Sequence, residues 1–320
     1  MLRIILSAAI GAVVLTAGAQ AQTWPNRPVR IVVPSPPAGG TDIVARVMAD
    51  HFSKAFKQQF FVENRPGAGN MIGIESVARA ANDGYTFLMT ASTLSINSVL
   101  YKKVSYDPIK DFAPITLAAM APNVLIVNPS VPAKTLAEFV ALAKKQPGKL
   151  TYGTPGIGTS PHMCMELFKS LAGVDLQHIP YRGTVPALTD VMSGQINAMF
   201  ATALSAKPQI AAGKVRALGV STAKRSGNMP DIPSVAEAGV PGYEAVQWYG
   251  FLAPAGTPPA IIAQIHAEAV KALHSAQMRE KLAHDGAEPV GSSSEAFAAH
   301  IRNELDKWRK VAKAAGIQPQ

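Results

Sequence analysis

The chain has 320 residues, a formal net charge of +9 at pH 7 and 48% hydrophobic residues. At roughly 100–200 residues per domain, this length predicts two domains, and the apolar content excludes a disordered chain. A positive field attracts anions of every size, but the cations occur in pairs without interleaved aromatic residues, which disfavours a nucleic-acid surface.

Residues 1–21 have the pattern of an export signal. Arg3 is followed by an apolar run at 4–16 and by the small-x-small sequence Ala19-Gln20-Ala21. We therefore expect cleavage after Ala21 and a soluble periplasmic protein. The later apolar runs are shorter than the roughly 18 residues that indicate a membrane span.

Apolar runs bounded by Gly and Pro alternate with helix-period segments along the remaining chain. The expected order is strand 29–33, loop 34–40, helix 42–56, strand 61–62, helix 71–81, strands 86–90 and 124–127, helix 135–145, strand 150–152, helix 160–173, strands 196–200, 215–220 and 250–253, helix 258–274, and a last helix from a capping box at 292–295 to about 313. This alternation predicts an α/β fold with two mostly parallel sheets, each flanked by helices.

Two loops share one design, in which a strand runs into a Gly/Pro-rich turn and then into a capped helix. They cover residues 33–42 and 152–161. Glycine permits close backbone approach, and the first helical turn leaves N–H groups without internal partners beside a positive dipole end. Facing each other across a cleft, two such loops would suit a ligand with two or more carboxylates. The alternative is that the glycines serve tight turns and that Ser160 is simply a helix N-cap.

Other chemistry has little support in the sequence. The second loop has the order G-x-x-G-x-G instead of a dinucleotide fingerprint, and no P-loop, H-E-x-x-H or G-x-S-x-G motif occurs. We expect no cofactor, no metal and no catalytic residues. The lone Cys164 excludes a disulfide within the chain and is expected to pack in the core.

Several motifs in one order resemble the periplasmic solute receptors of tripartite tricarboxylate transporters, the Bug-type receptors. The resemblance covers essentially the whole chain after the export signal. Its markers are residues 24–34, 38–42, 63–69, 83–86, 106–115, 153–162, 181–183, 233–243 and 253–258.

The resemblance implies a two-lobed, clamshell receptor of the type II periplasmic-binding-protein class without enzymatic activity. Lobe 1 would comprise residues 22–122 and 246–320, and lobe 2 residues 123–245. The ligand-binding residues that it implies are Ser35, Pro37, Ala38, Gly39, Gly40, Thr90, Ser92, Thr154, Gly156, Gly158, Thr159, Ser160, His162, Tyr181, Ala201 and Thr202. They follow the carboxyl ends of strands, where open α/β sheets bind ligands.

Two departures from the family pattern bear on the ligand. Ser35 stands where the family usually has an aromatic residue, and Ala201 stands where many members have an aspartate. We therefore expect a non-amino-acid carboxylate, such as a bulkier di- or tricarboxylate or an aromatic acid. A monomer would capture it and deliver it through transient contact to integral membrane transporter subunits. A receptor that feeds a signalling system and a periplasmic hydrolase remain as alternatives.

Overall fold

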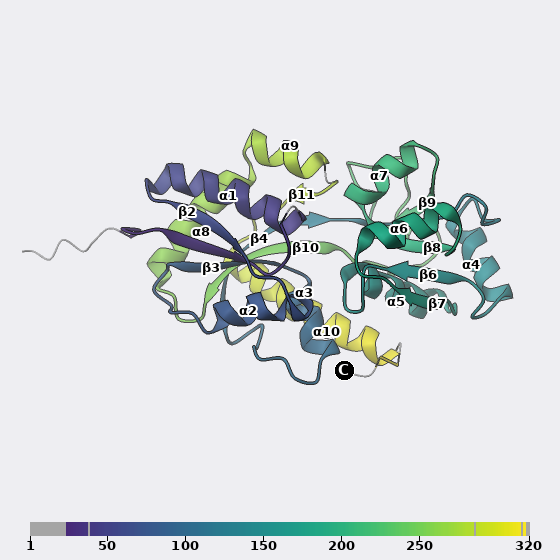
Figure 1. Ribbon diagram of the computed structural model, residues 1–320, viewed down its shortest axis with the longest axis horizontal. Helices are drawn as coiled ribbons and strands as arrows, with labels where there is room; N and C mark the ends of the chain where they lie inside the picture. The colour runs from purple at the N-terminus through teal and green to yellow at the C-terminus, as the bar shows by residue number, and fades with distance from the viewer. Residues whose placement is uncertain (1–23, 38, 285, 315, 318–320) are drawn as a thin grey trace, which may run out of the picture.

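The computed structural model describes residues 24–37, 39–284, 286–314 and 316–317. The expected export signal and its cleavage site lie outside the described residues, as does Ala38. Two sheets organise the chain, one on each side of the molecule (Figure 1). The six-stranded sheet has the order β11 (Glu288–Pro289), β4 (Phe112–Ala121), β10 (Gln247–Pro254), β3 (Thr86–Ala91), β1 (Val29–Val33) and β2 (Phe60–Asn64). The five-stranded sheet has the order β7 (Gln177–Pro180), β6 (Thr151–Thr154), β8 (Ala198–Thr202), β5 (Asn123–Val127) and β9 (Arg216–Val220).

Helices flank both sheets, which confirms the predicted α/β class (Figure 1). Around the six-stranded sheet lie α1 (Gly40–Phe56), the short helix η1 (Ala68–Asn70), α2 (Met71–Ala78), α3 (Thr93–Leu100), α8 (Pro259–Leu273) and α9 (Ala276–His284). Around the five-stranded sheet lie α4 (Leu136–Lys145), α5 (Ser160–Ala172), α6 (Thr184–Ser193) and α7 (Ala203–Ala211). The last helix is α10 (Ser294–Ala314). No helix among the described residues is both long and apolar enough to span a membrane.

The sheets are mixed, so the expectation of mostly parallel pairing needs correction. β1 pairs in parallel with β2 and β3, and β6 pairs in parallel with β7 and β8. By contrast, β10 is antiparallel to β3 and β4, and β5 is antiparallel to β8 and β9. The parallel pairs are joined through helical crossovers. The antiparallel strands instead carry the chain between the sheets, because only Pro122 separates β4 from β5.

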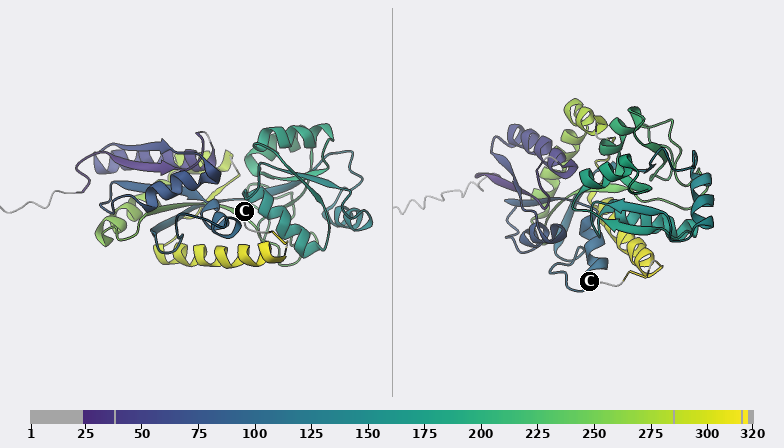
Figure 2. Two further views of the ribbon diagram at one scale, coloured as in Figure 1. Left: turned by 60° about the horizontal axis from the view of Figure 1, so that its bottom comes forward. Right: turned by 45° about the vertical axis from the view of Figure 1, so that its right-hand side comes forward.

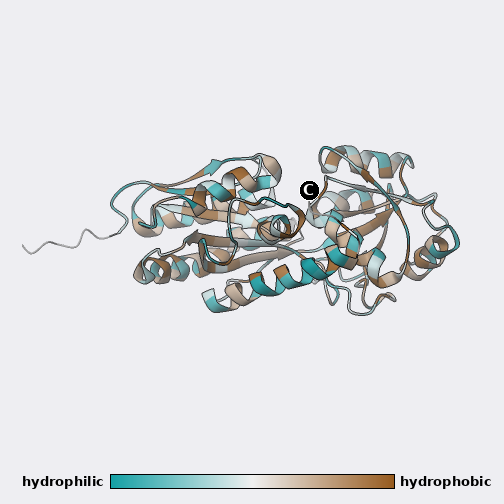
Figure 3. Cartoon of the chain, turned by 90° about the horizontal axis from the view of Figure 1, so that it is seen from below, coloured by the Kyte–Doolittle hydropathy of each residue, from teal (hydrophilic) through white to brown (hydrophobic). Residues whose placement is uncertain are grey.

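The helix α10 packs into the cores of both lobes. Its buried residues recur at helical spacing. Phe297, Ile301 and Leu305 join a cluster under the six-stranded sheet, whereas Trp308 and Val311 join the cluster of the five-stranded sheet. Figure 2 shows this helix in yellow running along the first lobe to the edge of the second, and Figure 3 shows its hydrophilic outer face.

A buried carboxylate lies where α10 passes from the core of the first lobe to that of the second. Glu304 is 4% exposed and accepts hydrogen bonds from the indole nitrogens of Trp248 at 3.0 Å and Trp308 at 2.8 Å. Lys307 forms an ion pair with the same carboxylate. The helix α3 is shared in a similar way, because its Leu94 belongs to the first cluster and its Leu100 to the second. The lobes therefore share packed helices as well as crossing strands.

Candidate functional site

The first Gly-rich loop joins the buried strand β1 to α1. Gly39 is the N-cap residue of α1, with φ −84° and ψ 166°, and its carbonyl accepts from the Ile43 amide at 3.0 Å. A Cβ atom at Gly40 would lie 2.1 Å from the hydroxyl oxygen of Tyr249, so glycine is required there by the close approach of that ring. Pro37 is exposed on the same loop.

Three predicted hydroxyl residues gather at this edge of the six-stranded sheet. β1 and β3 are neighbours, with Val32 opposite Leu88, so Ser35, just after β1, and Thr90, near the end of β3, lie on adjacent strands. The hydroxyl oxygens of Ser35 and Thr90 are buried and have no hydrogen-bond partner among the described residues. Ser92 is also buried, and its hydroxyl donates to Gln247 Oε1 at 3.1 Å. Buried hydroxyls of this kind are groups that a ligand or a water satisfies.

The second Gly-rich loop joins β6 to α5 and depends on two glycines with positive φ. Gly156 has φ +141° and Gly158 has φ +77°, conformations that side chains with a Cβ rarely adopt. Thr159 closes the turn, because its hydroxyl donates to the Gly156 carbonyl at 2.8 Å. Pro161 has no N–H group, so the first turn of α5 offers the amides of Ser160 and His162, which have no acceptor within the helix.

The interpretation of Ser160 as the N-cap of α5 is wrong by one residue. The N-cap is Thr159, and Ser160 is already helical and buried. The Ser160 hydroxyl instead accepts from Asn123 Nδ2 at 3.0 Å, where β5 enters the second lobe. The side chain that the sequence assigns to capping therefore fixes the start of α5 to the chain crossing.

His162 lies directly behind the second loop. Its side chain is buried, and its Nδ1 accepts from the Gly158 amide at 3.3 Å, so this loop amide already has a hydrogen-bond partner on α5. The His162 ring stacks on His178 with centroids 4.6 Å apart. Burial and the neighbouring His178 lower the pKa of His162 to about 4, and burial also lowers the pKa of His178. Both rings are therefore neutral at pH 7.

The remaining predicted residues lie on other elements of the second lobe. The Tyr181 hydroxyl donates to Asp190 at 2.6 Å, and burial together with this carboxylate raises the pKa of Tyr181 to about 12. Thr202 is the N-cap residue of α7, and its hydroxyl lies 3.1 Å from that of Ser205. Ala201 has no exposed surface and packs in an apolar cluster of the five-stranded sheet.

The second loop also touches the first lobe. A Cβ atom at Gly158 would lie 3.2 Å from Leu100 Cδ1 and 4.0 Å from Asn97 Oδ1, both on α3. Asn97 in turn donates to the carbonyl of Gly69 at 2.7 Å. In Figure 1, β1 and β6 run toward the middle of the molecule from opposite sides, so the loops that follow them both belong to the region between the lobes.

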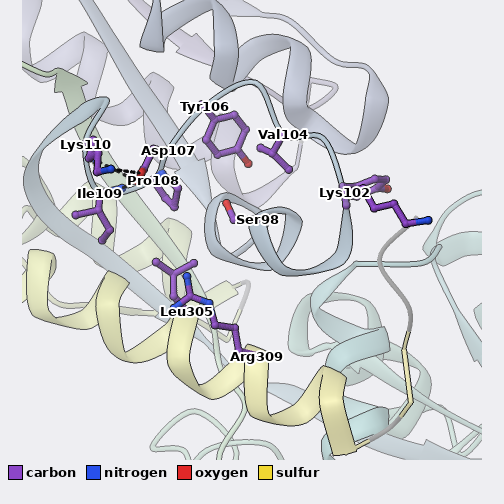
Figure 4. Close-up of a pocket in the computed structure, with 11 residues that line it drawn as sticks. Ser98, Lys102, Val104, Tyr106, Asp107, Pro108, Ile109, Lys110, Leu305 and Arg309 are labelled. Carbon is purple, nitrogen blue, oxygen red and sulfur yellow. Dashed lines mark hydrogen bonds and ion pairs between the residues drawn. The ribbon is translucent and has the colours of Figure 1, made fainter.

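A cavity of about 510 Å³ lies elsewhere, between the segment 101–110 and α10 (Figure 4). Its lining includes Lys102, Lys110 and Arg309, and Lys110 forms an ion pair with Asp107 at 3.7 Å. None of the predicted ligand-binding residues lines it. No group of three or more metal-ligating side chains occurs in the part of the chain that the structure describes.

Two residues near the loops are missing from the predicted site, His178 and Asn123. His178 reaches the second loop because the parallel register of β6 and β7 places it opposite Tyr152. Asn123 reaches it because β5 starts immediately after the crossing from the first sheet. Strand register is the signal that would have found His178, and the position of the chain crossing is the one that would have found Asn123; single-sequence patterns specify both weakly.

Comparisons with known proteins agree with this architecture. The family model described as "Tripartite tricarboxylate transporter family receptor" matches residues 44–317. A UPF0065 protein from the tcbD-tcbE intergenic region of Pseudomonas sp. strain P51 is 36% identical over 308 residues, covering 95% of this chain and 92% of the relative. Protein BugT of Bordetella pertussis is 33% identical over 319 residues, covering 98% of each chain.

Solved structures show the same fold. Rpa4515 of R. palustris, solved with adipate, has a TM-score of 0.83 and 38% identity, covering 93% of this chain and 100% of that one. MatC of Rhodopseudomonas palustris, solved with bound malate, has a TM-score of 0.78 and 32% identity, covering 90% and 99%. The two-lobed periplasmic-binding-protein fold is thereby confirmed. The chain belongs to the family of tripartite tricarboxylate transporter receptors.

Proposed function

We propose that this protein is a periplasmic receptor that captures a small carboxylate between its lobes and delivers it to a membrane transporter through transient contact. In this proposal lobe 1 comprises residues 22–122 and 246–320, and lobe 2 residues 123–245. The protein acts as a monomer without catalysing a reaction, and its export signal is removed after Ala21.

The observation that carries the proposal is the pair of strand, Gly-rich loop and helix units, one on each sheet. Each unit directs the amides of a helix N-terminus away from its sheet, which provides anion binding without a charged side chain. The buried hydroxyls of Ser35 and Thr90 add groups that a bound ligand would satisfy. The adipate and malate in the two similar structures support a carboxylate as the ligand class.

Hydrogen bonds to the charged groups of the ligand are strong enough to account for a micromolar dissociation constant. A hydrogen bond to a charged group contributes about 1.5–3 kcal/mol net. Four or five of them offset the ordering of two lobes and leave about −8 kcal/mol, which corresponds to a micromolar dissociation constant. Closure follows because the amides of the second lobe reach the ligand only in the closed form, so the ligand binds that form more tightly.

The proposed choice of ligand rests on two uncharged residues, Ser35 and the fully buried Ala201. Neither side chain carries a charge, so the site lacks the aspartate that would pair with a ligand ammonium group at position 201. We therefore propose a non-amino-acid ligand, such as a dicarboxylate, a tricarboxylate or an aromatic acid.

A thermal-unfolding screen with adipate, malate, citrate, benzoate, aspartate and glutamate tests this function. Ligand at about 100 times its dissociation constant adds about 2.7 kcal/mol of stability, which a melting curve resolves. We expect stabilisation by at least one of the first four compounds and weaker effects of the two amino acids. Tight binding of aspartate or glutamate alone would contradict the proposed ligand class.

Gly156→Ala and Gly173→Ala compare a glycine in the loop with one outside it. An added Cβ atom meets nothing closer than 3.7 Å at either position, and φ is +141° at Gly156, where alanine is strained, and +61° at Gly173, where the strain is smaller. Gly156 is in the second loop, whereas Gly173 is the C-cap residue of α5, at the end of the helix opposite the loop. We expect Gly156→Ala to weaken carboxylate binding at least tenfold in isothermal titration and Gly173→Ala to leave binding unchanged.

A further inference from the structure

A row of buried and half-buried side chains supports the second loop from behind. It starts at the Gly158 amide, which donates to Nδ1 of His162. The His162 ring stacks on His178, and His178 stacks on Tyr152 with ring centroids 4.8 Å apart and an angle of 14° between the planes. The three rings come from α5, β7 and β6, so the row joins three elements of the second lobe next to the loop.

Each ring in this row has its own polar anchor. Nε2 of His178 lies 2.7 Å from the hydroxyl of Thr154, the last residue of β6 before the loop. The Tyr152 hydroxyl donates to Glu166, and Lys169 holds the same carboxylate at 2.9 Å. The row therefore contacts the loop at two points, the Thr154 hydroxyl at its start and the Gly158 amide near its end.

We propose that His162 and His178 are positioning residues for ligand capture, which set the shape of the second loop through Gly158 and Thr154 without contacting the ligand. This inference rests on the proposed function, because the loop that they hold is the one assigned to the carboxylate. In this role His162 works as a hydrogen-bond acceptor and not as a cation.

The chemistry of the imidazole requires this role to belong to the neutral ring. Only a neutral ring has a lone pair at Nδ1, and a protonated ring would direct an N–H group at the N–H group of Gly158. The charged and titratable groups that face His162 are His178 on β7 and Glu166 and Lys169 on its own helix. Glu166 favours a protonated ring, but burial, His178 and Lys169 oppose it, and the resulting pKa of about 4 leaves the ring neutral at pH 7.

Two substitutions test whether the side chain at position 162 acts as a hydrogen-bond acceptor. His162→Asn places an amide oxygen close to the position of Nδ1, and His162→Leu keeps an apolar side chain of similar length without an acceptor. In isothermal titration with adipate and malate at pH 7.5, we expect His162→Asn to bind within threefold of the wild type. We expect His162→Leu to bind at least tenfold more weakly.

Hydrogen exchange of the Gly158 amide gives a second readout that needs no ligand. The amide should be protected in the wild type and in His162→Asn, and it should exchange at least tenfold faster in His162→Leu. Thr154→Ser and Thr154→Val repeat the comparison at the His178 end, with the serine variant keeping wild-type affinity and the valine variant losing it. This second pair serves the test if His162→Leu does not fold.

The outcomes distinguish this inference from the proposed function. Equal losses of affinity in His162→Asn and His162→Leu would overturn the positioning role, because they would show that the ligand needs the imidazole itself. Wild-type affinity and wild-type exchange in His162→Leu would overturn it as well. A wild-type protein that binds no carboxylate would overturn the proposed function, and the exchange rates would still decide whether His162 holds the loop.

Discussion

Replacing His162 with asparagine should reduce the loss of stability that acid causes. The pKa of this histidine is lowered from 6.5 to about 4 in the folded protein, mainly by burial. Between these values the unfolded chain binds a proton that the folded protein does not, so the free energy of unfolding falls as the pH falls below 6.5. For a single group with these two pKa values, the loss at pH 5 is about 2 kcal/mol relative to pH 7.5.

Urea unfolding at pH 7.5 and pH 5.0 measures this difference directly. The free energy of unfolding of the wild type should fall between the two pH values by about 2 kcal/mol more than that of His162→Asn. Part of the acid sensitivity should remain in the variant, because burial lowers the pKa of His178 and His300 too. The same decrease in both proteins would refute the conclusion that His162 is buried in its neutral form.

The other predictions concern stability at two buried contacts. Gly40→Ala should destabilise the protein by about 1–3 kcal/mol, because the new Cβ atom would lie 2.1 Å from the Tyr249 hydroxyl oxygen, as measured by thermal unfolding. Gly39→Ala is its control, with an ordinary φ of −84° and nothing closer than 3.9 Å, and a cost as large as that of Gly40→Ala would contradict the clash. Glu304→Ala should lower the free energy of urea unfolding by about 3–5 kcal/mol, because two buried indole N–H groups lose their acceptor. Asp306→Ala on the exposed side of the same helix should change it by less than about 0.5 kcal/mol, and equal effects of the two substitutions would argue against a special role of the buried carboxylate.

Local pattern predicted the elements that carry the two loops. The strand at 29–33 and the helix that follows it occur as expected, because a continuous apolar run ends in Pro and Gly and an amphipathic segment follows. The start of α5 was less predictable. Both Thr159 and Ser160 are residues that cap helices, and the choice depends on Asn123, which binds the Ser160 hydroxyl from a strand 37 residues away.

Features that depend on packing between distant segments could not be predicted from local pattern. The periodicity of α10 shows which face is buried, but not that Phe297 and Trp308 enter the cores of different lobes. The ring stack of His162, His178 and Tyr152 likewise requires the register of β6 against β7. The mixed pairing of β5 and β10 follows from how the chain crosses between sheets, which an alternating strand and helix pattern does not encode.

A crystal structure of the protein grown with adipate or malate would show where the ligand binds. We expect one carboxylate group of the ligand within about 3 Å of the amides at the start of α1 or α5, with the other loop completing the site from the opposite lobe. Ligand bound only in the cavity beside α10, or in any place remote from both loops, would contradict this expectation.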